Sequence, residues 1–191
     1  NRKHYKVIND VIMTTGKGSS QIDHLVISIY GIFVIETKHY QGWIYGHEDY
    51  NDWTQTFFKK RYKFRNPILQ NWGHINTLRL FLSEFPYIPF LPIVVFSGKA
   101  KLKKITSQVP VITSNKLIRY IRKSSTSEYL SKEDVYEIYQ KLVGLKRTKQ
   151  VSKRSHIINV KTNKRRNKKS HTCPRCGGRL ILKDGKYGMF F

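Results

Sequence analysis

The sequence has little cysteine and no long apolar run. Only two of its 191 residues are cysteines, so a disulfide scaffold is excluded and a metal or redox role is favoured for that pair. We expect a reducing, cytoplasmic setting on this basis. No run of eighteen apolar residues occurs, so we expect no membrane-spanning segment. The Gly-x-x-x-x-Gly-Lys-Ser/Thr spacing is absent around Gly16–Ser19, which argues against nucleotide hydrolysis.

Acidic residues are also scarce, and their scarcity is uneven. The chain carries 36 Lys and Arg against 12 Asp and Glu, a net charge of +24. Residues 1–145 hold 21 basic and 11 acidic side chains, whereas residues 146–191 hold 15 basic and one acidic. Such a charge attracts polyanions, because phosphate contacts release condensed counterions. Nucleic acid is the favoured partner. An anionic membrane surface is the weaker alternative, since the basic tail has no amphipathic apolar face.

The apolar fraction of 39% is enough for one domain with a small appendage. Two nearly continuous β-branched runs, 21–28 and 32–38, predict central strands that are covered on both faces. Weaker strand signals lie at 5–8, 11–13, 42–45, 53–58 and 92–96, and a short edge strand at 109–112. The last is an edge because Pro110 cannot donate to a ladder. The fold class is therefore α/β, with a mixed sheet flanked by helices.

Helix signals are found in the second half of the domain. Asn66-Pro67 supplies an N-cap followed by proline, and apolar residues then recur at helical spacing until Phe85. A short helix is predicted over 116–122. Ser131 and Asp134 form a capping-box pattern that starts a last helix, which runs to Leu145.

Asp23, Glu36 and Lys38 are the residues that point to chemistry. Glu36 and Lys38 alternate on one predicted strand, so their side chains share a face. An even-numbered loop between the two strands would put Asp23 on that face as well. Two carboxylates and an ammonium among apolar residues are costly for structure alone. Mg²⁺ would resolve the arrangement by binding carboxylate oxygens and water. A solvent-exposed Glu36–Lys38 pair is the equally weighted alternative.

Several motifs in order resemble a known family. They are Gln21–His24, Tyr30–Lys38, Gly42–Gly46, Trp53 and Asn66–Asn71. Together they are similar to the nuclease-related domain, a family assigned to the Asp…Glu-x-Lys restriction-endonuclease-like superfamily. The resemblance covers roughly residues 5–115. It implies Mg²⁺ or Mn²⁺ ligation by Asp23 and Glu36, a catalytic role for Lys38, and a positioning role for Gln70.

The family usually carries a further Glu on a helix before the first strand. This chain begins after that point, so we expect one acidic site residue to lie outside it. The first domain is accordingly predicted over residues 1–145, without its N-terminal helix.

Basic clusters are the predicted nucleic-acid contacts. One is a loop over 59–65 in which aromatic residues interleave with Lys59, Lys60, Arg61, Lys63 and Arg65. A second is a linker over 146–170 with eleven basic residues and no acid, among them Lys164, Arg165, Arg166, Lys168 and Lys169. Such contacts with phosphate supply affinity without sequence selectivity.

Cys173 and Cys176 occur in a Cys-Pro-Arg-Cys-Gly-Gly motif. Residues 171–191 resemble the first half of a topoisomerase-type four-cysteine zinc finger. Zn²⁺ needs four ligands and a Cys-x-x-Cys knuckle supplies two, so the finger is expected to be incomplete here.

The sequence thus predicts a Mg²⁺-dependent nuclease-like domain that hydrolyses phosphodiester bonds in nucleic acid, with DNA favoured. The rival hypothesis is a non-catalytic nucleic-acid-binding module with the same fold and basic surface. The sequence does not separate DNA from RNA, endo- from exonucleolytic cleavage, or one oligomeric state from another.

Overall fold

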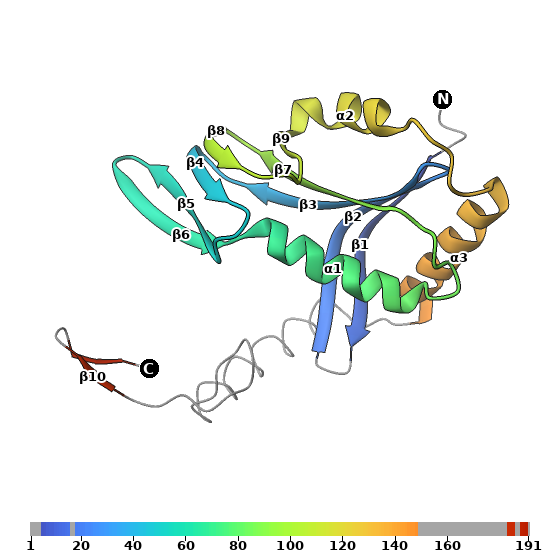
Figure 1. Cartoon of the computed structure of the whole chain (residues 1–191), viewed down its shortest axis with the longest axis horizontal. Helices are drawn as coiled ribbons and strands as arrows, with labels where there is room; N and C mark the ends of the chain where they lie inside the picture. Colours follow the sequence, from blue (N-terminus) through green and yellow to red (C-terminus); the bar gives the residue numbers. More distant parts are fainter. Residues whose placement is uncertain (1–4, 16–17, 149–182, 186–187, 191) are drawn as a thin grey trace. The chain divides into compact units, whose positions relative to one another are not determined.

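The computed structural model describes residues 5–15, 18–148, 183–185 and 188–190. Residues 5–13 and 20–148 form an α/β unit with two mixed sheets flanked by helices, as predicted, and this arrangement is consistent with a restriction-endonuclease-like fold (Figure 1). Lys183–Gly185 (β10) and Gly188–Phe190 (β11) pair antiparallel and belong to a separate unit. Within the described residues, no helix is long and apolar enough to cross a membrane.

The larger sheet has five strands in the order β1-β2-β3-β7-β9. Their bounds are Tyr5–Thr15 (β1), Gly18–Ser28 (β2), Gly31–His39 (β3), Phe90–Ser97 (β7) and Val111–Thr113 (β9). β3 pairs antiparallel with β2 and parallel with β7, and β7 pairs parallel with β9. β3 is therefore the central strand, and its first six residues are all buried. The prediction of a buried central strand is confirmed, as is the edge position of β9.

Helices cover both faces of this sheet (Figure 1). Pro67–Phe81 (α1) and Lys132–Thr148 (α3) contribute Ile75, Leu78, Ile138 and Leu142 to a core with Ile32 and Val34 of β3. Leu117–Ser124 (α2), preceded by a 3₁₀ turn over Ser114–Lys116, covers the opposite face. There Ile121 packs with Phe33 and Ile35 of β3. Alternate residues of β3 thus enter two different cores, as strand geometry requires.

The smaller sheet has four strands in the order β6-β5-β4-β8. Their bounds are Lys60–Arg65 (β6), Asp52–Phe57 (β5), Gly42–His47 (β4) and Ala100–Thr106 (β8). β4, β5 and β6 pair antiparallel in succession, and β8 runs parallel to β4. The inner face of this sheet packs Ile44 and Trp53 against Val94 and Phe96 of β7 and Ile68 of α1.

The two predicted helix starts are confirmed by their hydrogen bonds. The Asn66 side chain accepts from the Ile68 N–H at 2.9 Å, and Pro67 occupies the first turn of α1. Ser131 and Asp134 bond reciprocally, because the Ser131 N–H donates to Asp134 Oδ2 and the Asp134 N–H donates to Ser131 Oγ. Both motifs supply partners for N–H groups that a helix leaves unbonded at its first turn.

Two strands differ from the sequence prediction. Residues 60–65, predicted as part of a basic loop, form β6, and β8 was not predicted at all. Both are edge strands with few apolar residues, so neither shows the apolar run that marked β2 and β3. Each is held instead by its ladder and by a few inward side chains, Phe64 in β6 and Ala100, Leu102 and Ile105 in β8.

Candidate active site

β3 places Glu36 and Lys38 on the face that α1 covers. Val34 packs with α1, and Glu36, two residues further along the strand, points to the same face. The carboxyl group of Glu36 lies inside the fold, with the residue only 1% exposed. The alternative hypothesis of a solvent-exposed Glu36–Lys38 pair is therefore wrong for Glu36. Because an unpaired buried charge costs several kcal/mol, partners for this carboxylate are required.

Lys38 is the first partner. Its Nζ donates to Glu36 Oε1 at 2.6 Å and to Gln70 Oε1 at 3.0 Å. The Lys38 side chain is 20% exposed, so its ammonium lies between the buried carboxylate and solvent. Three of the four predicted catalytic residues, from β3 and α1, are thus joined in one network.

His74 is the second partner, and it is not among the residues predicted for the site. His74 Nε2 lies 3.2 Å from Glu36 Oε2, and Nδ1 lies 2.7 Å from Ser20 Oγ. An ionised carboxylate only accepts hydrogen bonds, so Nε2 is the donor to Glu36. One signal was available, since residues four apart lie on one helix face and His74 follows Gln70 by four. The link to Ser20 had no sequence signal.

Asn71 fixes α1 to the sheet beneath the site. Its Nδ2 donates to the carbonyls of Val34 at 2.9 Å and Ile93 at 3.2 Å, so it bridges β3 and β7. Asn71 is fully buried, and its Oδ1 has no hydrogen-bond partner among the described residues. Gln70, Asn71 and His74 lie on two successive turns of α1. The Asn71 bridge therefore holds Gln70 and His74 at a fixed distance from β3.

Asp23 makes a different contact from the one expected. Its Oδ2 accepts from the Thr37 N–H at 2.9 Å and from Thr37 Oγ1 at 2.7 Å. The alternation of β2 is interrupted here, since Ile22 enters the same core as Leu25 although their positions differ by an odd number. Asp23 therefore fixes the β3 backbone between Glu36 and Lys38. No hydrogen bond from a described residue to its Oδ1 is found.

The donor chemistry suits a hard divalent cation. The described residues contain no group of three or more His, Cys, Asp or Glu arranged to hold a metal. Mg²⁺, however, typically takes only one or two carboxylates and completes its shell with water and substrate phosphate. Asp23 offers Oδ1, because Oδ2 already accepts two hydrogen bonds, and each Glu36 oxygen accepts one bond and keeps a second lone pair. The residues present therefore fit Mg²⁺ or Mn²⁺ by donor type.

Of the predicted nucleic-acid contacts, the first cluster lies among the described residues, and its five basic residues are exposed. Lys59 precedes β6, and the four other basic residues lie on that strand. The second cluster, Lys164, Arg165, Arg166, Lys168 and Lys169, lies outside the described residues. So do Cys173 and Cys176, the predicted Zn²⁺ ligands.

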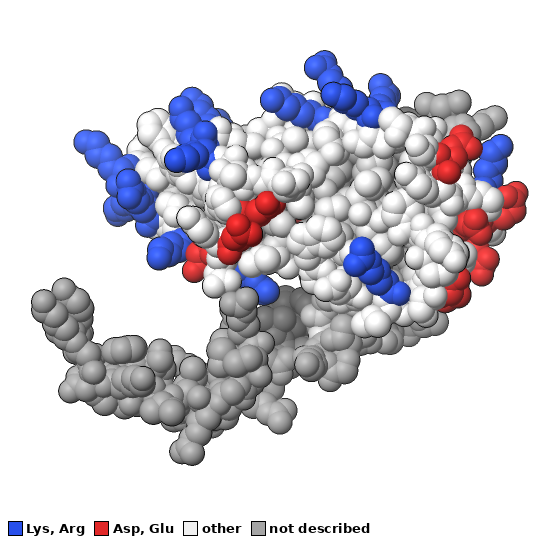
Figure 2. Space-filling view, viewed as in Figure 1, with Lys and Arg blue, Asp and Glu red and all other residues white. Residues whose placement is uncertain are grey.

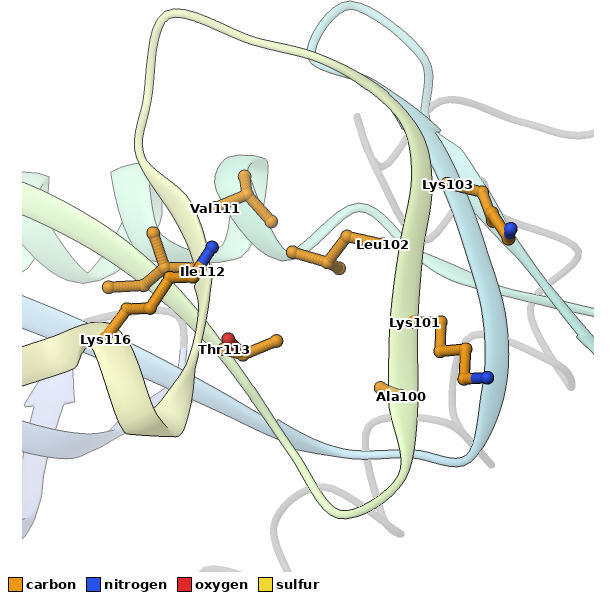
Figure 3. A pocket seen from close by; sticks show the side chains of 8 residues that line it. All are labelled: Ala100, Lys101, Leu102, Lys103, Val111, Ile112, Thr113 and Lys116. Carbon is orange, nitrogen blue, oxygen red and sulfur yellow. The ribbon is translucent and has the colours of Figure 1, made fainter.

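A pocket of about 290 Å³ lies between β8 and β9, apart from these residues (Figure 3). Leu102 points into it towards Val111, and Lys116 lies at its border. Lys101 and Lys103 point away from it, to the other side of β8. None of the four predicted catalytic residues lines this pocket.

The fold and the site define a class of protein. A mixed α/β domain carries a Glu-Thr-Lys sequence on its central strand, and an aspartate on the neighbouring strand bonds to the residue between Glu36 and Lys38. These are features that the resemblance to the nuclease-related domain implies.

Comparison with known proteins agrees, because residues 1–97 match the model of the nuclease-related domain. The chain belongs to the nuclease-related domain family. It is also 36% identical over 145 residues to an uncharacterized protein of Bacillus anthracis, a match that covers 74% of this chain and 67% of that protein. No solved structure gives a significant match.

Proposed function

We propose that this domain hydrolyses phosphodiester bonds in nucleic acid, with DNA favoured, in a reaction that depends on Mg²⁺ or Mn²⁺. The observation that carries the proposal is the buried Glu36 carboxylate bonded to Lys38, which is itself bonded to Gln70. Burying such a group costs stability, and proteins retain it where chemistry needs a positioned charge. Membership of the nuclease-related family supports phosphodiester cleavage as that chemistry.

Each side chain has a role that follows from its position. Lys38 carries a positive charge at the boundary between core and solvent, where it can stabilise negative charge that develops on a phosphate. Gln70 accepts a hydrogen bond from Lys38 and so directs its Nζ. His74 holds the second Glu36 oxygen, which fixes the orientation of the carboxylate. Asp23 and Glu36 would hold the cation, which when bound supplies an activated water and neutralises phosphate charge.

A non-catalytic nucleic-acid-binding module is the alternative, and one observation favours it. Both oxygens of Glu36 already accept hydrogen bonds, from Lys38 and His74. A carboxylate that accepts a hydrogen bond at each oxygen can serve as a structural anchor for α1. The two proposals differ in what happens to a phosphodiester bond, so cleavage separates them.

The test is nicking of supercoiled plasmid by the full chain with Mg²⁺, Mn²⁺ or EDTA. Glu36→Gln and Lys38→Ala should each lower the nicking rate about 100-fold or more, the loss typical of removing one group that stabilises transition-state charge. Plasmid binding should change little. Lys141→Ala is the matched control, because Lys141 is also part-buried and paired with a glutamate, Glu84.

Thermal melts of the variants show whether each remains folded. Nicking that persists in EDTA, or that survives in both site variants while they remain folded, would contradict the catalytic proposal. Binding without cation-dependent nicking by the unmodified chain would favour the non-catalytic module.

A further inference from the structure

The outer face of the four-stranded sheet is basic along both edges. In β5–β6 the register pairs Trp53 with Phe64 on the inner face, so the alternate residues of β6 point outward. In β8 the inward residues are Leu102 and Ile105, and a register shift beside Ile44 inserts an extra residue between them. We call the exposed residues that result the outer basic face: Arg61, Lys63, Arg65, Lys101, Lys103 and Lys104.

An exposed tryptophan lies between these two edges. Trp43 of β4 pairs with Thr56 of β5 and with Lys101 of β8, and it is 46% exposed. The Nζ of Lys103 lies over its ring, 4.9 Å from the centroid. Tyr62 of β6 is similarly exposed, at 49%, whereas Trp53 on the inner face of the sheet is buried. Core packing therefore does not account for Trp43.

The charge of the face is not neutralised within the domain. None of its six basic side chains forms an ion pair with a described residue. One acidic residue, Asp52, lies opposite Arg65 at the end of β5. Figure 2 shows Lys and Arg gathered over the end of the molecule that carries β5, β6 and β8, whereas most acidic side chains gather around α3 at the other end.

We propose that the outer basic face binds single-stranded nucleic acid, with Trp43 as a stacking platform. The basic edges contact phosphates, and a base replaces the Lys103 ammonium on the indole ring, freeing it to bind a phosphate. A single strand is favoured over a duplex because its unpaired bases expose their π-faces. This inference rests on the proposed function in taking nucleic acid as the ligand. It concerns a surface separate from Glu36, Lys38 and Gln70.

The face is close enough to serve that site. Trp43 follows Lys38 by five residues, so their Cα atoms lie at most about 18 Å apart along an extended chain. The outer face is opposite the one that packs on β7, so a strand held over Trp43 would pass around an edge of the four-stranded sheet to reach Lys38. By that route the outer basic face would supply single-stranded substrate to the site.

The experiment is fluorescence anisotropy of the full chain with a labelled 15-nucleotide single strand and with the matching duplex. It is done in EDTA, so that it reports binding without cleavage. Trp43→Ala should weaken single-strand binding at least fivefold, the lower range for one stacked base, and change duplex binding less. Tyr87→Ala is the aromatic control, because Tyr87 is 88% exposed and lies outside the sheet.

Two triple variants that remove the same charge test where on the domain the single strand binds. Arg61, Lys63 and Arg65 changed to Ser should flatten the slope of log K against log salt by about two for the single strand, at roughly 0.7 per contact. The same change at Arg119, Arg122 and Lys123 of α2 removes an equal charge and should flatten it much less. Equal slopes for the two triples, or unchanged single-strand binding by Trp43→Ala, would overturn the proposal.

These results do not depend on cleavage. If nicking fails while Trp43→Ala and the β6 triple weaken single-strand binding, the proposed activity is wrong and the binding face stands. If the chain nicks plasmid but neither variant changes single-strand binding, the proposed binding face is wrong and the proposed activity stands.

Discussion

The site at Glu36 and the outer basic face are two polar regions built in opposite ways. At the site, a carboxylate is buried and each of its oxygens is bonded to a named side chain. On the face, six basic side chains are exposed and form no ion pair with the described residues. Buried charges must be paired to be tolerated, whereas exposed charges cost little. Substitutions should therefore affect stability strongly at the first region and mainly affect binding at the second.

The largest effect is expected when a buried partner is removed. His74→Ala leaves a Glu36 oxygen and Ser20 without that bond and opens a cavity, so we expect a loss of about 3 kcal/mol in the free energy of unfolding. His39→Ala is the matched control, because His39 also contacts a serine, Ser97, but is exposed. It should cost less than about 0.5 kcal/mol. Urea unfolding at pH 7 measures both, and equal losses would contradict the comparison.

A smaller effect is expected on the inner face of the four-stranded sheet. A Cβ added at Gly46 would lie 2.2 Å from Cδ2 of the buried Trp53, so Gly46→Ala should cost about 1–3 kcal/mol through overpacking. Gly73→Ala in α1 is the control, since nothing lies within 4 Å of its added Cβ. That change should stabilise the helix by about 0.5 kcal/mol or more. Urea unfolding curves of the two variants measure both changes. If Gly46→Ala leaves the free energy of unfolding unchanged, the inner face of the four-stranded sheet is packed less tightly than the structure indicates.

The smallest effect is expected at a single charge in the first turn of α3. The Ser131 N–H bonded to Asp134, helped by the Ser131 hydroxyl, lowers the pKa of the Asp134 carboxyl below its ordinary value. A lowered pKa in the folded state means stability that is present above the unfolded pKa and lost as pH falls through the folded one. Asp134→Asn should therefore reduce stability at pH 7 by roughly 0.5 kcal/mol, the lower end for helix caps.

The difference between variant and parent should shrink as pH falls below the ordinary aspartate pKa of about 4 and disappear once pH has passed through the lower folded pKa, because the aspartate is then protonated. Thermal melts between pH 3 and 7 give the measurement. A difference that stays constant across this range would show that the bond, and not the charge, is responsible.

Elements with local signals were predictable from the sequence. The Asn66-Pro67 start of α1, the Ser131–Asp134 capping box and the apolar run of β3 each depend on neighbours in the chain. The pairing of Glu36 with Lys38 was also predictable, because residues two apart on a strand share a face.

The remaining features depend on contacts between distant segments. β6 and β8 carry basic residues that mask their strand character, and their ladders to β5 and β4 supply what the local sequence lacks. The bond between His74 and Ser20 joins residues 54 positions apart. The contact of Asp23 with Thr37 follows an interruption in β2 that apolar spacing did not reveal. Such features require the tertiary structure.

The site combines an anchored helix, α1, with a flexible side chain, that of Lys38. Asn66 Nδ2 contacts the carbonyls of His47, Glu48 and Tyr50, and Asn71 ties the next turn of the helix to β3 and β7. Gln70, between these two anchors, cannot follow a neighbour that shifts. Lys38 has a flexible four-carbon stem that ends near solvent. If a phosphate binds here as proposed, we expect the Lys38 ammonium to move and its bond to Gln70 to open.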